Sequence, residues 1–168
     1  MKRFGLLLGA FLILTGLTFW DNGLQDIYTY RKEARVCFYL TANETLDLSN
    51  FSNDIIIIRN GAGIIVDAPA EKAAALRAGF SDIKGESVSF DGTRSDAREI
   101  IKIYRVRITG GESILLDAGG SSIYIIYGYS KLLTSSVTLD GSEVNIQIAV
   151  NSITGKVAVG TPLILGSY

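Results

Sequence analysis

Apolar and polar positions divide the chain into an uncharged N-terminal run and a longer part in which short apolar stretches alternate with polar turns. The run contains seventeen mostly apolar residues, from Phe4 to Trp20, and follows Lys2 and Arg3. As a helix it would reach about 26 Å, close to the ~30 Å hydrocarbon core of a bilayer. The basic flank predicts that this end stays in the cytoplasm and that the following residues lie outside. We therefore expect residues 1–20 to be a signal-anchor or a signal peptide.

Residues near the end of the run bear on whether it is cleaved. Signal cleavage requires small residues at the last and third-last positions, and only Gly16 with Thr18 meets this requirement, beside the bulky Phe19 and Trp20. We favour the uncleaved anchor, which gives a single-pass protein of the cytoplasmic membrane with its C-terminal domain outside. Cleavage would give a secreted protein. Residues 21–33 are expected to form a juxtamembrane linker or a short helix, and residues 34–168 a single domain.

In the first half of the domain, the pattern predicts strands and two helices. Strands are expected at 34–41, 54–59, 64–66 and 86–90. Residues 60–63 predict a hairpin turn between the two isoleucine-rich strands, whose continuous apolar character predicts burial on both faces. An alanine-rich run at 70–78, between Pro69 and Gly79, predicts a helix. A second helix is expected over 95–104, with Thr93 and Asp96 at its start. Either a strand follows this helix, or one element takes the whole stretch to residue 108.

The second half of the domain reads as successive strands separated by turns. Strands are expected at 113–116, 122–127, 135–139, 143–150, 156–159 and 163–165, with turns at 117–120, 140–141 and 154–155. Within 143–150, apolar residues alternate with polar ones, which predicts a strand with one wet face. The fold class expected is therefore α+β: a largely antiparallel, curved β-sheet with about two helices on one face and the other face partly exposed.

Composition excludes several kinds of chemistry. Beyond Lys2 and Arg3, the chain has 14 basic against 17 acidic residues. The two kinds are interspersed, with Arg105 and Arg107 the only close alternating basic pair, on a predicted strand, so we expect no nucleic-acid partner. The absence of histidine rules out Ser-His and Cys-His nucleophiles and histidine-ligated zinc. Cys37 is the only cysteine, so no internal disulfide can form, and we interpret it as a buried apolar residue. We expect no cofactor and no metal site.

Tyr127 and Tyr129 are the candidate binding residues. In a strand they share one face, while Tyr124 and Ile126 take the other. Tyrosine rings offer contact area with a polar tip at low entropic cost, so an open sheet face with both rings could bind a glycan, a peptide or another subunit. Core packing is the alternative explanation for these rings.

Acidic residues at the predicted turns suggest a different activity. Asp91, Asp117, Asp140 and Glu143 include pairs that, placed across a cleft, could cleave a wall polysaccharide by acid and base catalysis. Asp before Gly is also ordinary turn chemistry, which accounts for these residues without any catalytic role.

The C-terminal third resembles a known family. Asn145-Ile-Gln-Ile-Ala149, then Gly160-Thr-Pro-Leu-Ile164 and Tyr168, are similar to the ending of the YwmB family. The resemblance implies an exported protein of Gram-positive bacteria with a TATA-box-binding-like fold, a curved antiparallel sheet with flanking helices. It implies no activity and no catalytic residues.

These observations favour a membrane-tethered, extracytoplasmic, non-enzymatic binding domain of the bacterial cell envelope. Its expected contacts are the membrane, through residues 4–20, and an unknown envelope protein or glycan. A carboxylate-dependent wall polysaccharide hydrolase is the alternative function. A third hypothesis is that the partner is a second copy of the chain, joined through strand edges.

Overall fold

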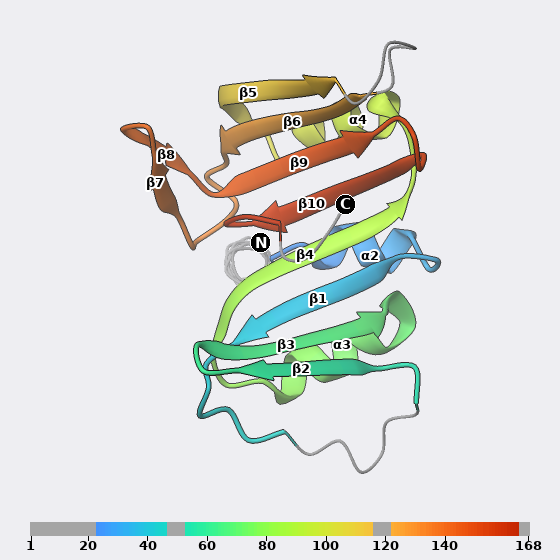
Figure 1. Ribbon diagram of the computed structural model, residues 1–168, viewed down its shortest axis with the longest axis vertical. Helices are drawn as coiled ribbons and strands as arrows, with labels where there is room; N and C mark the ends of the chain where they lie inside the picture. Colours follow the sequence, from blue (N-terminus) through green and yellow to red (C-terminus); the bar gives the residue numbers. More distant parts are fainter. Residues whose placement is uncertain (1–22, 47–52, 116–121, 165–168) are drawn as a thin grey trace, which may run out of the picture.

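Eight strands form one antiparallel sheet in the computed structural model, which describes residues 23–46, 53–115 and 122–164 (Figure 1). The strand order is β2-β3-β1-β4-β10-β9-β6-β5. The strands are β1 (Arg35–Leu40), β2 (Ile56–Asn60), β3 (Gly63–Pro69), β4 (Ile83–Asp91), β5 (Arg107–Leu115), β6 (Ser122–Tyr129), β9 (Ile146–Asn151) and β10 (Lys156–Thr161). β7 (Val137–Leu139) and β8 (Ser142–Val144) form a separate hairpin. The mixed α+β class with a large antiparallel sheet is therefore as predicted.

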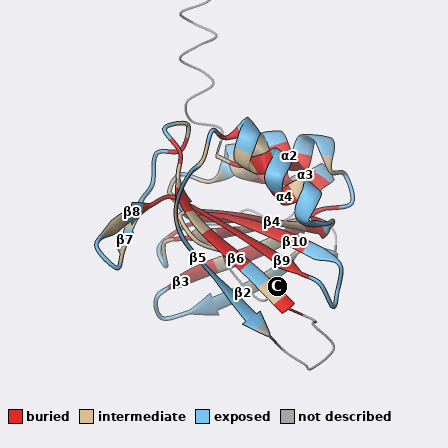
Figure 2. Ribbon diagram, turned by 90° about the horizontal axis from the view of Figure 1, so that it is seen from above, coloured by how far each residue is buried: buried red, intermediate tan, exposed pale blue. Residues whose placement is uncertain are grey.

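Three helices of the described part of the chain lie on one side of this sheet (Figure 2). They are α2 (Gln25–Tyr30), α3 (Ala70–Gly79) and α4 (Arg94–Ile103), and the last two occupy the positions that the sequence predicts. α2 lies in the segment expected to be a linker or a short helix. Leu24, Ile27 and Tyr28 are buried with the core, so the packed part of the chain includes this helix.

The hydrophobic core fills the space between the helices and the facing side of the sheet. Alternate strand residues point into it, and several are fully buried: Val36, Phe38, Leu40, Val66, Val88, Phe90, Ile146, Ile148, Val157 and Val159. Phe38 meets Phe80 edge to face, with ring centroids 5.3 Å apart. Full burial of each such side chain is worth about 1.5 to 3 kcal/mol.

The turn residues behave as their chemistry predicts. The Asn60 Oδ1 atom accepts hydrogen bonds from the backbone N–H groups of Ala62 and Gly63 in the β2–β3 turn. Asp140 and Gly141 have φ values of 48° and 77° in the β7–β8 turn, and left-handed backbone at both positions suits a two-residue hairpin.

Two predictions about burial are wrong. β2 is an edge strand, and its residues Ile56 and Ile58 are 52% and 53% exposed, because they point to the side of the sheet away from the helices. In contrast, β9 lies inside the sheet and is buried along its whole length, so it has no wet face. An alternating or continuous apolar pattern does not reveal which strand becomes an edge.

Strand boundaries also differ from the prediction in the last third of the chain. The expected strand 143–150 is divided into β8 and β9, and Asn145 lies at the break. A cis peptide bond joins Thr161 to Pro162, after which residues 162–164 form a bend instead of a strand. In the first half of the chain, α4 ends at Ile103 and β5 begins at Arg107, in agreement with the helix-then-strand alternative.

Some predictions lie outside the described residues: the apolar segment Phe4–Trp20, the turn 117–120 and Leu165. Within the described ranges, no helix is long and apolar enough to cross a membrane.

Candidate binding site

Tyr127 and Tyr129 lie on the face of the sheet opposite the helices. Their neighbour Ile126 pairs with Ile148, and both belong to the core on the helix side. The alternation of β6 therefore turns the two tyrosines to the other face. Tyr124 takes the helix side, as predicted, where the Arg94 guanidinium of α4 lies 5.4 Å from its ring centroid.

Both tyrosines are half-buried and contact polar groups of the edge strand β5. The Tyr127 hydroxyl donates a hydrogen bond to Glu112 Oε1 at 2.7 Å. The Arg107 guanidinium lies 5.7 Å from the Tyr129 ring centroid, in a cation–π contact. The tyrosines are thus held in place by their neighbours, with part of each ring open to solvent.

The middle of this face is covered by the chain itself. Small residues Ala149, Ala158 and Gly160 are buried there, although the described helices all lie on the other side of the sheet. A Cβ atom on Gly160 would lie 2.3 Å from backbone atoms of Leu163 and Ile164, and the Ile164 N–H donates to Gln147 Oε1 at 2.9 Å. The chain after β10 therefore folds back over the centre, so the accessible parts of this face lie toward its two edges.

Three cations surround a cavity of about 470 Å³ at the β5 edge. Arg105, Arg107 and Lys131 line it together with Tyr129 and Leu132, and none of the described residues that line it is acidic. This cavity adjoins the predicted tyrosine site because Tyr129 belongs to both.

Arg105 occupies the left-handed position that ends α4. Its φ is 51°, its N–H bonds to the Lys102 carbonyl, and the N–H of Val106 bonds to the Ile101 carbonyl. This pair of hydrogen bonds is a Schellman motif, in which glycine is the most favourable residue at the left-handed position. Arg105 therefore occupies a backbone position at which conformational energy alone would favour glycine.

A buried carboxylate, Glu86, lies on the helix side of β4. It is 1% exposed, and its Oε2 atom accepts hydrogen bonds from Arg77 of α3 and from the Leu24 N–H that precedes α2. Burial raises the pKa of Glu86, and the Arg77 charge opposes that rise. A Cβ atom on Gly23 would lie 2.3 Å from Glu86 Oε2, so this close approach requires glycine. Glu86 therefore fastens the start of α2 to the sheet.

A cavity of about 360 Å³ lies beside Glu86. Gly23, Arg77, Glu86, Leu132 and Thr161 are among its lining residues. Leu132 also lines the cationic cavity, so the two cavities are neighbours at the end of the sheet where the described chain begins.

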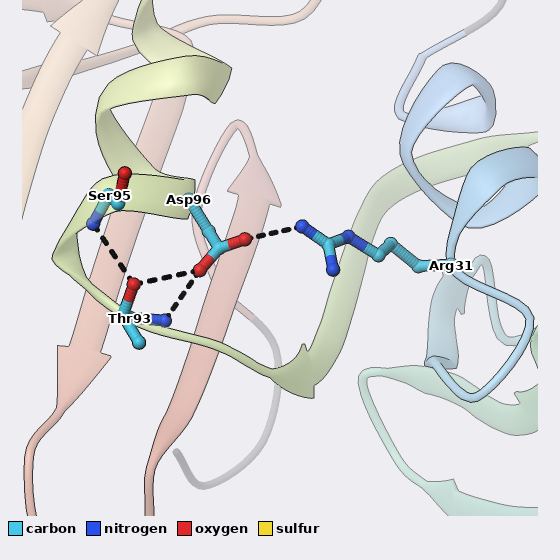
Figure 3. Close-up of polar contacts among 4 residues, drawn as sticks. All are labelled: Arg31, Thr93, Ser95 and Asp96. Atoms are coloured by element: carbon cyan, nitrogen blue, oxygen red, sulfur yellow. Dashed lines mark hydrogen bonds and ion pairs between the residues drawn. The ribbon is translucent and has the colours of Figure 1, made fainter.

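Figure 3 shows how the start of α4 is joined to the end of α2. The Thr93 hydroxyl accepts from the Ser95 N–H at 3.2 Å, and the Asp96 carboxylate accepts from the Thr93 N–H at 2.8 Å. The same carboxylate forms an ion pair with Arg31, whose guanidinium also lies 4.9 Å from the Phe90 ring centroid. The predicted cap is therefore present, and it also ties two helices together.

Replacing Asp96 by alanine is expected to lower the free energy of unfolding by about 1 to 2 kcal/mol, because both the cap and the ion pair are lost. Hydrogen bonds from Thr93 and the contact with Arg31 hold the pKa of Asp96 below its usual 3.8. The stabilisation is therefore present above pH 3.8 and is lost as the pH falls through the lowered value. Urea unfolding at pH 7 and at low pH measures it. The exposed Glu99 on the same helix is the control, and an equal loss in Glu99→Ala would contradict the role of Asp96.

Of the acidic turn residues that the structure describes, Asp91 lies apart from Asp140 and Glu143. Asp91 ends β4, with its carboxylate 2.8 Å from Lys156 Nζ, whereas Asp140 and Glu143 belong to the β7–β8 hairpin, beyond the other end of the strands (Figure 1). Glu143 accepts a hydrogen bond from the Ser136 hydroxyl. Asp117 lies outside the described residues.

Sequence reasoning missed the roles of Glu86 and Lys131. Glu86 shares a strand face with Val88 and Phe90, and this alternation is a signal for a buried carboxylate. Lys131 carries no such signal, because it reaches the cationic cavity only through the arrangement of the loop after β6.

The chain matches no known family model, no curated protein and no solved structure.

Proposed function

We propose that this protein is a membrane-tethered, non-enzymatic binding domain on the outer side of a bacterial cytoplasmic membrane. It presents the β5–β6 end of its sheet to an envelope protein or glycan. The apolar segment Phe4–Trp20 is the tether in this proposal. Tethering raises the effective concentration of a partner at the membrane surface, so that a modest contact area suffices.

The observation that carries the proposal is the placement of Tyr127 and Tyr129. Both rings lie on the helix-free face, and neither belongs to the core. Ile114, which is 43% exposed, lies on the same face of the adjacent strand, since it pairs with Ile123 of β6. Aromatic rings and an exposed aliphatic side chain on one sheet face are typical of binding surfaces.

Crosslinking in cells tests this face. A photoreactive amino acid at Ile114 is expected to capture a partner in the otherwise unchanged chain. Replacing Tyr127 and Tyr129 by glutamate should lower the yield of that product about tenfold or more, since charge and lost ring contact both disfavour the interface. The product is measured by immunoblot and identified by mass spectrometry.

Tyr30→Glu is the matched control, because Tyr30 is 86% exposed on α2, on the other side of the sheet. It should leave the crosslink unchanged. If the double glutamate variant keeps the product while its circular dichroism is unaltered, this face is not the binding surface.

A further inference from the structure

Backbone contacts bring together the segments that carry the three exposed cations of the β5-edge cavity. The Ser130 hydroxyl donates a hydrogen bond to the Tyr104 carbonyl. Lys131 and Arg105 directly follow these two residues in the chain, so this bond brings their backbones close together. Arg107 is paired with Tyr129 across the β5–β6 ladder. The cations are therefore brought together by the fold, and not by flexible surface segments.

A buried amide fixes the loop that carries Lys131. The Asn145 side chain is 1% exposed, accepts from the Ser130 N–H at 2.7 Å, and donates to the Ser130 and Leu133 carbonyls at 2.7 and 3.0 Å. The loop from Ser130 to Leu133 thus has a defined geometry, which a binding site requires.

The positive charge of the cavity is not balanced by ion pairs. Among the residues that the structure describes, none of Arg105, Arg107 and Lys131 forms an ion pair. Yet the whole chain has a net charge of −1. Three cations around one cavity repel each other unless an anion lies between them. Two guanidinium groups and an ammonium group match the oxygens of a phosphate, which arginine can bind through paired hydrogen bonds.

The cavity lies close to where the tether enters the domain. Gly23 lines the adjacent cavity, and Leu132 lines both. Only Asp21 and Asn22 separate Gly23 from Trp20, so a tether that spans the bilayer brings this end of the sheet to the membrane surface.

We propose that Arg105, Arg107 and Lys131 bind the phosphate of an anionic phospholipid headgroup in the outer leaflet. The choice of a lipid over a free phosphate rests on the proposed membrane tether. A bound headgroup would fix the orientation of the domain relative to the membrane.

A titration of the full-length chain in dodecyl maltoside micelles tests the proposal. The probes are dihexanoyl phosphatidylglycerol, dihexanoyl phosphatidylcholine and inorganic phosphate, with heats measured calorimetrically at low salt. We expect phosphatidylglycerol to bind more tightly than the other two, with an affinity that falls as salt is added. In Arg107→Gln/Lys131→Gln the affinity should fall about tenfold or more, because two charge-assisted contacts are lost.

Arg59→Gln is the matched control, since Arg59 is an exposed arginine on β2, at the opposite edge of the sheet. It should leave the affinity unchanged. Arg105→Gly is a second test variant, because glycine is favoured at that left-handed position and its fold should survive. This variant should also bind more weakly.

Equal affinity of the wild type and the cavity variants for phosphatidylglycerol would overturn the site. Equal binding of inorganic phosphate and phosphatidylglycerol would overturn the lipid assignment. Because the titration uses micelles, its result does not depend on where the chain lies in cells. A cytoplasmic chain would therefore refute the proposed function while the titration still decides the site.

Discussion

Replacing Arg77 by alanine is expected to lower the free energy of unfolding by about 3 to 5 kcal/mol at neutral pH, because it leaves the buried Glu86 carboxylate without its counter-charge. The carboxylate is 1% exposed, so water cannot replace the lost guanidinium without a structural change. Denaturant unfolding followed by circular dichroism measures the loss. The start of α2 should loosen as well, since the Leu24 N–H is bonded to the same carboxylate oxygen.

The pH dependence distinguishes this mechanism from a simple loss of packing. Burial raises the pKa of Glu86, so the neutral carboxyl is the form that folding favours relative to the unfolded chain. The stabilisation that comes from protonated Glu86 is complete below its usual pKa of 4.5, and it is lost as the pH rises through the raised pKa of the folded protein. The cost of Arg77→Ala should accordingly shrink as the pH is lowered from 8 toward 5.

Glu86→Gln is the control for this prediction. It removes the buried charge, and the Arg77 side chain that remains is 19% exposed and can reach water. The glutamine variant should therefore be less destabilised at neutral pH than Arg77→Ala and should lose the pH-dependent component. A cost of Arg77→Ala that is the same at pH 5 and pH 8 would contradict a charged Glu86 in the folded protein.

Replacing Asn145 by alanine is expected to cost about 3 kcal/mol, because three buried backbone groups lose their hydrogen-bond partner. These groups are the Ser130 N–H and the carbonyls of Ser130 and Leu133. Release of the Ser130–Leu133 loop should also displace Lys131, so phosphatidylglycerol binding should weaken in the same variant. Denaturant unfolding and amide exchange at Ser130 measure the structural effect.

Asn60→Ala is the comparison for Asn145→Ala. Asn60 also accepts backbone hydrogen bonds, from Ala62 and Gly63, but its turn is exposed, so water can take its place. We expect a loss of about 1 kcal/mol or less there. Equal losses at both positions would show that burial of the Asn145 network is not the source of its effect.

The parts of the fold that local chemistry decides are predictable from the sequence. Helix α3 follows Pro69 and contains the alanine-rich run, and α4 begins with the Thr93–Asp96 cap, as predicted. The β7–β8 turn lies at Asp140–Gly141 because these residues accept the left-handed backbone. In each case the deciding residues are within a few positions of one another.

Features that depend on distant pairing were not predictable. The exposure of Ile56 and Ile58 follows from the position of β2 at the sheet edge, which the apolar run does not encode. Burial of both faces of β9 depends on its place inside the sheet and on the return of residues 162–164 over its outer side. The α2 helix is held by Glu86, more than fifty residues away along the chain.

The candidate site likewise has a part that the sequence predicts and a part that it does not. Strand alternation correctly placed Tyr127 and Tyr129 together on one face, with Tyr124 on the other. The cationic cavity was not foreseen, although Arg105 and Arg107 are close in sequence. Its third cation, Lys131, joins them only through the contact of Ser130 with Tyr104.

The location of the domain relative to the membrane is tested most directly by labelling a single cysteine in intact cells. Burial raises the pKa of Cys37 to about 11, which makes this thiol a poor target, and Cys37→Ser removes it altogether. Thr138→Cys then introduces a thiol at an exposed position of β7. A membrane-impermeant maleimide should label it in intact cells, and the labelled chain should sediment with the membranes after a carbonate wash. Labelling only after the cells are permeabilised would contradict the extracytoplasmic location on which the proposed function rests.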